Sequence, residues 1–117
     1  MIMILPGGDM PLFLLLNDIM YLTKDKKYTL YHCIVRGMES EEKNIKYRER
    51  ASLETVFARL PQNRFILITK GVIVNMKHVI RVEKRSVIMR DGMRFSISNI
   101  RKEEVCGQMA AYWSDER

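Results

Sequence analysis

The sequence predicts a mainly β fold of antiparallel strands with one or two short helices. Most apolar residues occur in short runs in which apolar and polar side chains alternate, as they do along a half-buried strand. Turn-forming residues separate these runs, and only two segments have the spacing of an amphipathic helix. With 117 residues, 47% of them apolar, the chain has the size and composition of one domain. We place this domain at residues 10–117, after an N-terminal segment at residues 1–9.

The first half of the chain is predicted to form strands joined by tight turns. Residues 6–9 (Pro-Gly-Gly-Asp) and the charged run at residues 24–27 are the turns. The expected strands are residues 11–16, 19–22, 28–34 and 44–50, and residues 37–42 form a polar loop. The apolar run at residues 12–16 is far shorter than the roughly 20 residues that a membrane-spanning helix needs, so we expect it to be a strand.

The second half begins with a helix and continues with more strands. Ser52 is the expected N-cap of this helix, which ends before Pro61. Strands are expected at residues 65–69, 72–76, 79–83, 86–90 and 93–97, and Asp91-Gly92 predicts a type I′ turn between the last two. A C-terminal helix at about residues 101–113 would present Val105, Met109 and Trp113 as one apolar stripe.

Positive charge is concentrated between Asn63 and Lys102. This stretch holds ten Lys and Arg residues against Glu83 and Asp91, a balance of +8, whereas the whole chain carries +6. A β-rich unit that concentrates positive charge is typical of proteins that bind a polyanion, and nucleic acid is the first candidate. In the alternative interpretation these side chains only solvate a surface and protect sheet edges.

The sequence contains no recognisable catalytic or metal-binding pattern. Cys33 and Cys106 lie far apart without CxxC spacing, which favours a reducing cytoplasm and two small buried thiols. His32 and His78 have no Cys or carboxylate at ligand spacing, so we expect satisfied polar side chains rather than metal ligands. There is no Ser/His/Asp or Cys/His grouping and no phosphate-binding glycine loop. We therefore expect neither an enzyme nor a cofactor.

Several segments together resemble the LytTR family of bacterial DNA-binding domains. Residues 73–79 (Ile-Val-Asn-Met-Lys-His-Val) are similar to the central motif of the family, Arg64 and Phe65 open its aromatic-led strand, and Asp91-Gly92 takes the place of its hairpin. Residues 18–22 (Asp-Ile-Met-Tyr-Leu) also fit its first strand. The resemblance extends over about residues 10–108.

The resemblance implies a β-sandwich-like fold in which loops, rather than a recognition helix, enter successive major grooves of double-stranded DNA. The expected DNA contacts are Lys26, Lys27, Tyr28, Thr29, Thr69, Lys70, Lys77, Ser98, Asn99, Arg101 and Lys102. Lys70 can donate to guanine or to a phosphate, and Ser98 or Asn99 can read a base edge. Residues 69–72 read Thr-Lys-Gly-Val where the family commonly has His-Arg-Ser-Tyr, and Asn99 stands where an Arg is usual. We therefore expect a base preference different from that of typical members.

The function that the resemblance implies is transcriptional regulation in the bacterial cytoplasm. Family members often bind repeated sites, so a homodimer on DNA is expected, and a membrane protein or another regulatory partner can control them. The module commonly serves as the output domain of a response regulator. Because almost no residues precede the first expected strand, we expect a free-standing regulator without a receiver domain.

Three alternatives stay open at this point. The chain could be a protein-interaction module on the same fold, an inhibitor or partner of a regulator, that does not bind DNA. It could instead bind RNA through Tyr28, Tyr31 and Tyr47 as stacking groups. Asn75 could satisfy backbone groups inside the fold or could contact DNA directly.

Overall fold

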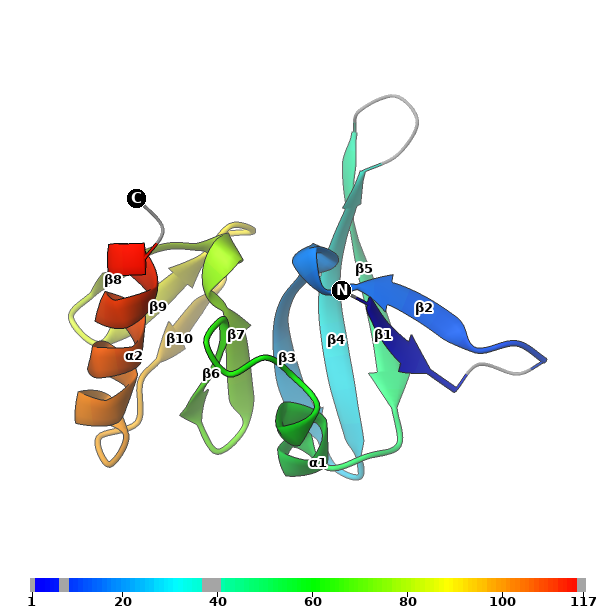
Figure 1. Ribbon diagram of the computed structural model, residues 1–117, viewed down its shortest axis with the longest axis horizontal. Coiled ribbons are helices and arrows are strands. Elements are labelled where there is room, and N and C mark those ends of the chain that lie inside the picture. The colour runs from blue at the N-terminus through cyan, green and yellow to red at the C-terminus, as the bar shows by residue number, and fades with distance from the viewer. Residues whose placement is uncertain (1, 7–8, 37–40, 116–117) are drawn as a thin grey trace.

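The computed structural model describes residues 2–6, 9–36 and 41–115, and within them the chain forms three antiparallel sheets (Figure 1). The largest sheet has the strand order β5-β4-β3-β7-β6, the second β10-β9-β8, and the third consists of β1 and β2. The strands are β1 (Ile2–Leu5), β2 (Leu12–Leu15), β3 (Ile19–Asp25), β4 (Tyr28–Arg36), β5 (Glu42–Glu49), β6 (Phe65–Thr69), β7 (Val72–Asn75), β8 (Val79–Glu83), β9 (Ser86–Met89) and β10 (Arg94–Ser96). The helices are α1 (Leu53–Ala58) and α2 (Lys102–Asp115), with 3-10 turns at Leu16–Asp18 and Met76–His78. The predicted mainly β fold is confirmed.

Two segments near the N-terminus and the middle of the chain differ from their predictions. β1 was not expected as a strand, yet it pairs along its whole length with β2. The expected turn at residues 6–9 and the expected loop at residues 37–42 lie partly outside the described residues. At the end of that loop, Glu42 already belongs to β5, where it pairs with Arg36.

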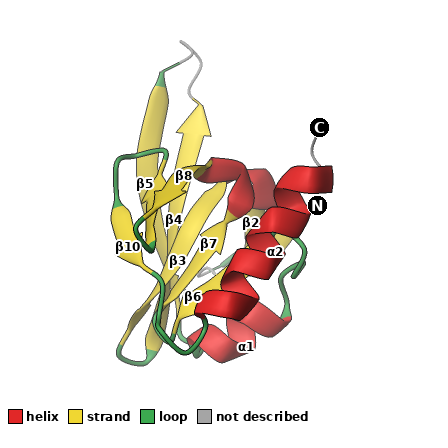
Figure 2. Ribbon diagram, turned by 90° about the vertical axis from the view of Figure 1, so that its left-hand side faces the viewer, coloured by secondary structure: helices red, strands yellow, loops and turns green. Residues whose placement is uncertain are grey.

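The five-stranded sheet separates two hydrophobic cores. On one face β1, β2 and α1 cover residues such as Tyr31 and Phe65; on the other, β9, β10 and α2 cover residues such as Ile68. Figure 2 shows α2 lying across the strands, with α1 at the lower end of the molecule. Strand β3 contributes side chains to both cores, and at a register shift between Ile19 and Tyr21 the consecutive residues Met20 and Tyr21 both face the second core.

Helix α1 begins as the sequence predicts. The Ser52 hydroxyl accepts a hydrogen bond from the Thr55 amide at 3.1 Å, which satisfies one of the free N–H groups of the first turn. Leu53, Val56 and Leu60 are buried in the first core. The helical spacing of these side chains therefore fixes α1 against the sheet.

The predicted apolar stripe of α2 is partly wrong. Val105 and Met109 are buried in the second core, but Trp113 is 43% exposed and Tyr112 packs against that core instead. Positions 105, 109 and 112 follow the helical repeat more closely than positions 105, 109 and 113 do, and Trp113 therefore turns away from the sheet.

The positions of the two tight turns in the second half differ from the prediction. β8 and β9 are joined by Lys84 and Arg85 with φ angles of 50° and 62°, and Glu83 pairs with Ser86, which is the geometry of a type I′ turn. The loop after β9 spans residues 90–92 and takes a positive φ, 88°, at Gly92 but not at Asp91. The type I′ turn predicted at Asp91-Gly92 is therefore wrong.

The two thiols occupy different environments. Cys33 is fully buried, and this burial raises the pKa of its thiol to about 12. Cys106 is exposed on α2, so the prediction of two buried thiols is correct only for Cys33. Among the described residues, no helix combines the length and the apolar character that crossing a membrane requires.

Candidate nucleic-acid interface

Three connections between strands and helices meet at one edge of the molecule. They are the β3–β4 turn, the β6–β7 turn and the connection from β10 to α2, which lie along the lower edge in Figure 1. The first two are neighbours because β3 and β7 pair with Thr23 opposite Val72. A hydrogen bond of 3.0 Å from the Lys24 amide to the Gly71 carbonyl continues this pairing into the β6–β7 turn. Sheet order thus brings together turns that are far apart in the sequence.

Hydrogen bonds from the backbone of Ser98 and the side chain of Arg101 hold the third connection against β6. The Ser98 amide donates to the Ile68 carbonyl at 3.0 Å. The Arg101 guanidinium donates to the Leu67 carbonyl at 3.5 Å, and the Arg101 amide donates to the Ser98 carbonyl at 3.1 Å. These bonds order the connection before any ligand binds.

Two shallow hollows open on this edge and share Lys70. The first is lined by Lys24, Lys26, Lys27, Arg50, Ala51, Ser52, Leu53, Glu54 and Lys70. The second is lined by Thr69, Lys70, Ser98, Ile100 and Arg101. Five basic residues of the first hollow plus Arg101 of the second make six, against one acid, Glu54. We call these six residues, Lys24, Lys26, Lys27, Arg50, Lys70 and Arg101, the basic edge.

Most cations of the basic edge form no ion pair within the described part of the chain. Among the described residues, Arg101 is the one member with an ion pair, a distance of 3.9 Å to Glu104. By contrast, Arg81 lies 3.6 Å from Glu83 and Arg90 pairs with Glu42. The basic edge therefore keeps most of its positive charge, which produces a positive potential there.

The basic stretch at residues 63–102 does not form one surface. Arg81, Arg90 and Arg94 each lie beside an acid away from the basic edge. Lys77 lines a different hollow, with Arg36 and other residues, beyond the opposite end of β7. Of the expected contact residues, Lys77 is therefore the one that the structure places far from the others.

Thr29 also differs from its expected place. Its side chain is fully buried, and its hydroxyl donates to the Ala51 carbonyl at 2.9 Å. The β3–β4 turn consists of residues 26–27, so Thr29 already lies inside β4 and faces the core. The expectation that Thr29 contacts DNA is inconsistent with this position.

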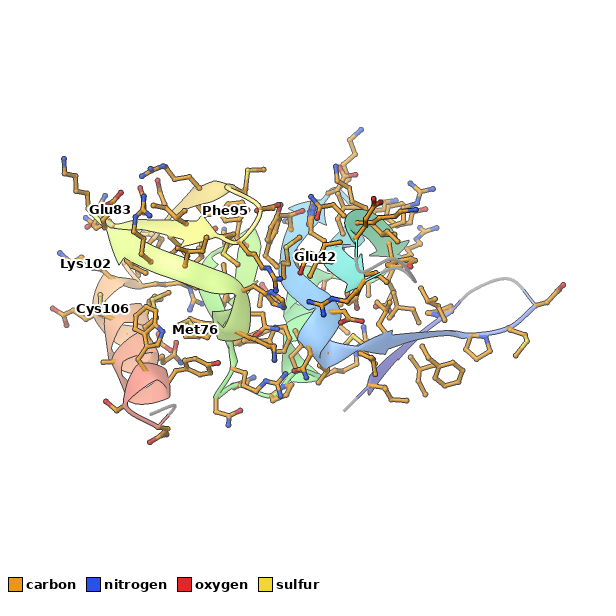
Figure 3. All side chains as sticks on the ribbon, turned by 90° about the horizontal axis from the view of Figure 1, so that it is seen from above. Glu42, Met76, Glu83, Phe95, Lys102 and Cys106 are labelled. Carbon is orange, nitrogen blue, oxygen red and sulfur yellow. The ribbon has the colours of Figure 1, made fainter. Side chains whose placement is uncertain are left out.

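The remaining expected residues lie at or beside the basic edge. The Tyr28 ring lies under the Arg48 guanidinium at 4.5 Å, and the Thr69 hydroxyl accepts from the Gly71 amide at 3.0 Å. Asn99 accepts a hydrogen bond of 2.6 Å from Arg85 of the β8–β9 turn. Lys102 is the exposed first residue of α2 and lies at the α2 end of the molecule, as Cys106 does (Figure 3).

Sequence reasoning missed Lys24 and Arg50 of the basic edge, and Ile100 of the second hollow. The sequence predicts Lys24 to be part of a charged turn and Arg50 to be an outward side chain of its strand. The alternation of side chains along residues 44–50 predicts that Arg50 points outward and could have marked it as a candidate contact. It does not say which surface of the molecule the side chain reaches. Nothing in the sequence distinguishes Ile100 from an ordinary helix-flanking residue.

Asn75 has a structural role. It is fully buried, and its amide group donates to the carbonyls of Leu16 and Ile19 at 3.2 and 2.8 Å. Its side-chain oxygen accepts from the Lys77 amide at 3.1 Å. The side chain thus joins the 3-10 turn before β3 to the one after β7, and a direct DNA contact is inconsistent with its burial.

The histidines are held by neighbouring groups of the fold. His32 lies 2.8 Å from the Thr23 hydroxyl and stacks on Tyr21, and burial lowers its pKa. His78 bonds the Asn17 carbonyl through Nε2, and burial also lowers its pKa, but its Nδ1 is buried without a partner. The expectation of fully satisfied side chains therefore fails at one nitrogen of His78.

The comparisons with known proteins agree with this architecture. The profile of the LytTr DNA-binding domain family matches residues 11–109. Among solved structures, the chain is similar to a LytTr DNA-binding domain from Bacillus cereus, described as part of a methyl-accepting/DNA response regulator. The two share 21% sequence identity and a TM-score of 0.66 over 92% of this chain and 95% of that one, which supports a common fold. No curated protein matches the chain in sequence.

Proposed function

This chain belongs to the LytTr DNA-binding domain family, and from that premise we propose that it binds specific sequences in double-stranded DNA as a bacterial transcriptional regulator. The observation that carries the proposal is the basic edge, in which six cations line two adjoining hollows that have one acid, Glu54, in their lining. Neutralising DNA phosphates with Lys and Arg releases counterions and supplies much of the affinity. Lys24, Lys27 and Arg50 would mainly position the duplex in this way.

The loops of the basic edge supply the sequence choice. Lys70 and Ser98 line one hollow and carry groups that can bond to base edges in the major groove. The molecule measures 43 × 35 × 23 Å, and one turn of B-DNA is about 34 Å long. The two long dimensions therefore allow the β3–β4 turn and the β10–α2 connection to reach successive major grooves. Neither a catalytic step nor a cofactor is part of this function.

The regulatory setting follows from the same proposal. A bacterial regulator of this kind acts in the cytoplasm, where its DNA is. Repeated sites on the DNA would bring two copies of the chain side by side as a homodimer. A membrane protein or another regulatory partner would provide the input signal.

The alternative function, a protein-interaction module, is favoured by one feature of the β1–β2 hairpin. Ile2, Ile4, Phe13 and Leu15 are all between 52% and 55% exposed, and they form the cross-strand pairs Ile2–Leu15 and Ile4–Phe13. An exposed apolar surface of this kind is typical of a protein contact. The basic edge, with its single lining acid, favours DNA as the primary ligand.

The proposal is tested by DNA selection followed by charge removal. Random duplexes are retained on the protein at several salt concentrations and sequenced, and affinity for the enriched duplex is then measured against salt. We expect enrichment of a short element and a steep fall of affinity with salt. The K27A/K70A variant should lower the slope of log K against log salt by about 0.9 for each phosphate contact that it removes.

The matched control is K43A/K77A, which removes the same two charges from exposed positions away from the basic edge. We expect its slope to stay close to that of the unaltered protein. If both variants lose affinity equally, net charge rather than the basic edge is responsible. If the unaltered protein retains no duplex even at low salt, the DNA-binding function is refuted and a protein partner has to be sought.

A further inference from the structure

Ile100 is an almost fully exposed aliphatic side chain on the proposed DNA-binding surface. It is 98% exposed, while the other large hydrophobic residues that are exposed in the described structure reach at most 71%, at Met10. A side chain with this exposure buries almost no apolar area and so contributes almost nothing to folding. Packing of the hydrophobic core therefore does not explain why an isoleucine occupies position 100.

The backbone that carries Ile100 is fixed. The Ser98 amide bonds to β6 at Ile68, and the Arg101 amide bonds to the Ser98 carbonyl at 3.1 Å and approaches the Ser98 hydroxyl at 3.3 Å. These bonds close a turn of residues 98–101 with Asn99 and Ile100 at its corner. The turn presents Ile100 outward before α2 begins.

The surroundings of Ile100 are polar and basic. It lines one hollow together with Thr69, Lys70, Ser98 and Arg101. Its two neighbours in the chain are already engaged, since Asn99 accepts a bond from Arg85 and Arg101 donates to the Leu67 carbonyl. Ile100 is thus the most prominent uncommitted group of the turn.

The chemistry of the major groove suggests what such a side chain can contact. Base edges present hydrogen-bond donors and acceptors, and the C5 methyl group of thymine is the one apolar group among them. An isoleucine beside phosphate-binding cations would meet unfavourable polar edges at most bases and a favourable apolar contact at thymine. We propose that Ile100 contacts a thymine methyl group and selects thymine over cytosine at one position of the site. This inference rests on the proposed DNA binding.

The test uses the duplex enriched by the selection described above, with each thymine replaced in turn by deoxyuridine, which lacks only the methyl group. We expect one position at which the replacement weakens binding about fourfold, the equivalent of one buried methyl group. I100A should bind the thymine duplex more weakly by at least the same factor. The variant should also be insensitive to uracil at that position.

The control variant is I80A, because Ile80 is an exposed residue, 57%, on β8 and does not line the basic edge. It should keep both the affinity and the sensitivity to uracil. Circular dichroism and thermal unfolding of I100A should match those of the unaltered protein.

The outcomes separate this inference from the function on which it rests. If the unaltered protein binds its duplex but no uracil replacement weakens binding, the thymine contact is refuted while DNA binding stands. If I100A remains as sensitive to uracil as the unaltered protein, Ile100 is not the group that reads the methyl. Retention of random duplexes without enrichment would also overturn the inference, and no retention at all would overturn it together with the proposed function.

Discussion

Asn75 shows how a single polar side chain can hold two distant segments together. Its three hydrogen bonds join residues on either side of the pairing between β3 and β7. A buried amide in this position hydrogen-bonds to backbone groups of both segments. The sequence alone left its role open, because an Asn beside a Lys and a His is equally compatible with DNA contact.

We expect N75A to lower the free energy of unfolding by about 2–3 kcal/mol, because it removes three hydrogen bonds of a fully buried amide. Urea denaturation of both proteins measures the difference. N99A is the control, since Asn99 is exposed, and its cost should stay within about 0.5 kcal/mol. Equal costs for the two variants would contradict the structural role of Asn75.

At the scale of elements, the two turns around β9 show where local rules apply. Asp-Gly is a common type I′ pair, yet Gly92 lies at the last position of a longer loop, and the Met89 amide bonds to the Met93 carbonyl across it. The type I′ geometry occurs instead at Lys84 and Arg85, residues that take positive φ only at a cost. The conformations of both turns therefore follow from the register of the strands in the three-stranded sheet and not from the turn propensities of the residues in them.

Two glycines with different backbone conformations provide a test at this scale. G92A should destabilise the protein by about 1 kcal/mol, because an alanine at a φ of 88° is strained. G107A should stabilise it by up to about 1 kcal/mol, because Gly107 lies within α2 and a Cβ there meets nothing within 4 Å. Thermal unfolding measures both changes. A change of the same sign in both variants would contradict the assigned conformations.

At the scale of the whole molecule, the five-stranded sheet is covered on both faces. β1 contributes Met3 and Leu5 to the core shared by β2 and α1, and Leu5 is 1% exposed. The first strand therefore takes part in packing, although it lies outside the residues that the family profile matches. The sequence of a short apolar segment does not show that the segment will be buried against residues far away in the chain.

L5A should lower the free energy of unfolding by about 2–5 kcal/mol, the range for truncating a buried leucine. I4A should cost less than about 1 kcal/mol, because Ile4 is 52% exposed on the other face of the same strand. Denaturant unfolding of the two variants provides the comparison. Similar small costs for both would show that β1 does not belong to the folded core.

The candidate interface also belongs to the scale of the whole molecule. Counting charge along the chain pointed to residues 63–102, but the structure pairs several of those cations with acids and places Lys77 far from the basic edge. The basic edge takes Lys24, Lys27 and Arg50 from the first half of the chain. Local charge density therefore indicated the class of ligand but not the surface that would bind it.

The sequence by itself determined the mainly β fold, most strands, the cap of α1 and the family resemblance. These features depend on alternation, helical spacing and short motifs, which are local properties of a chain. Only the tertiary structure decided that Thr29 and Asn75 are buried, that Trp113 turns away from the core, and which cations share an edge. Sheet order and register bring distant residues together, and no periodicity along a single chain encodes them.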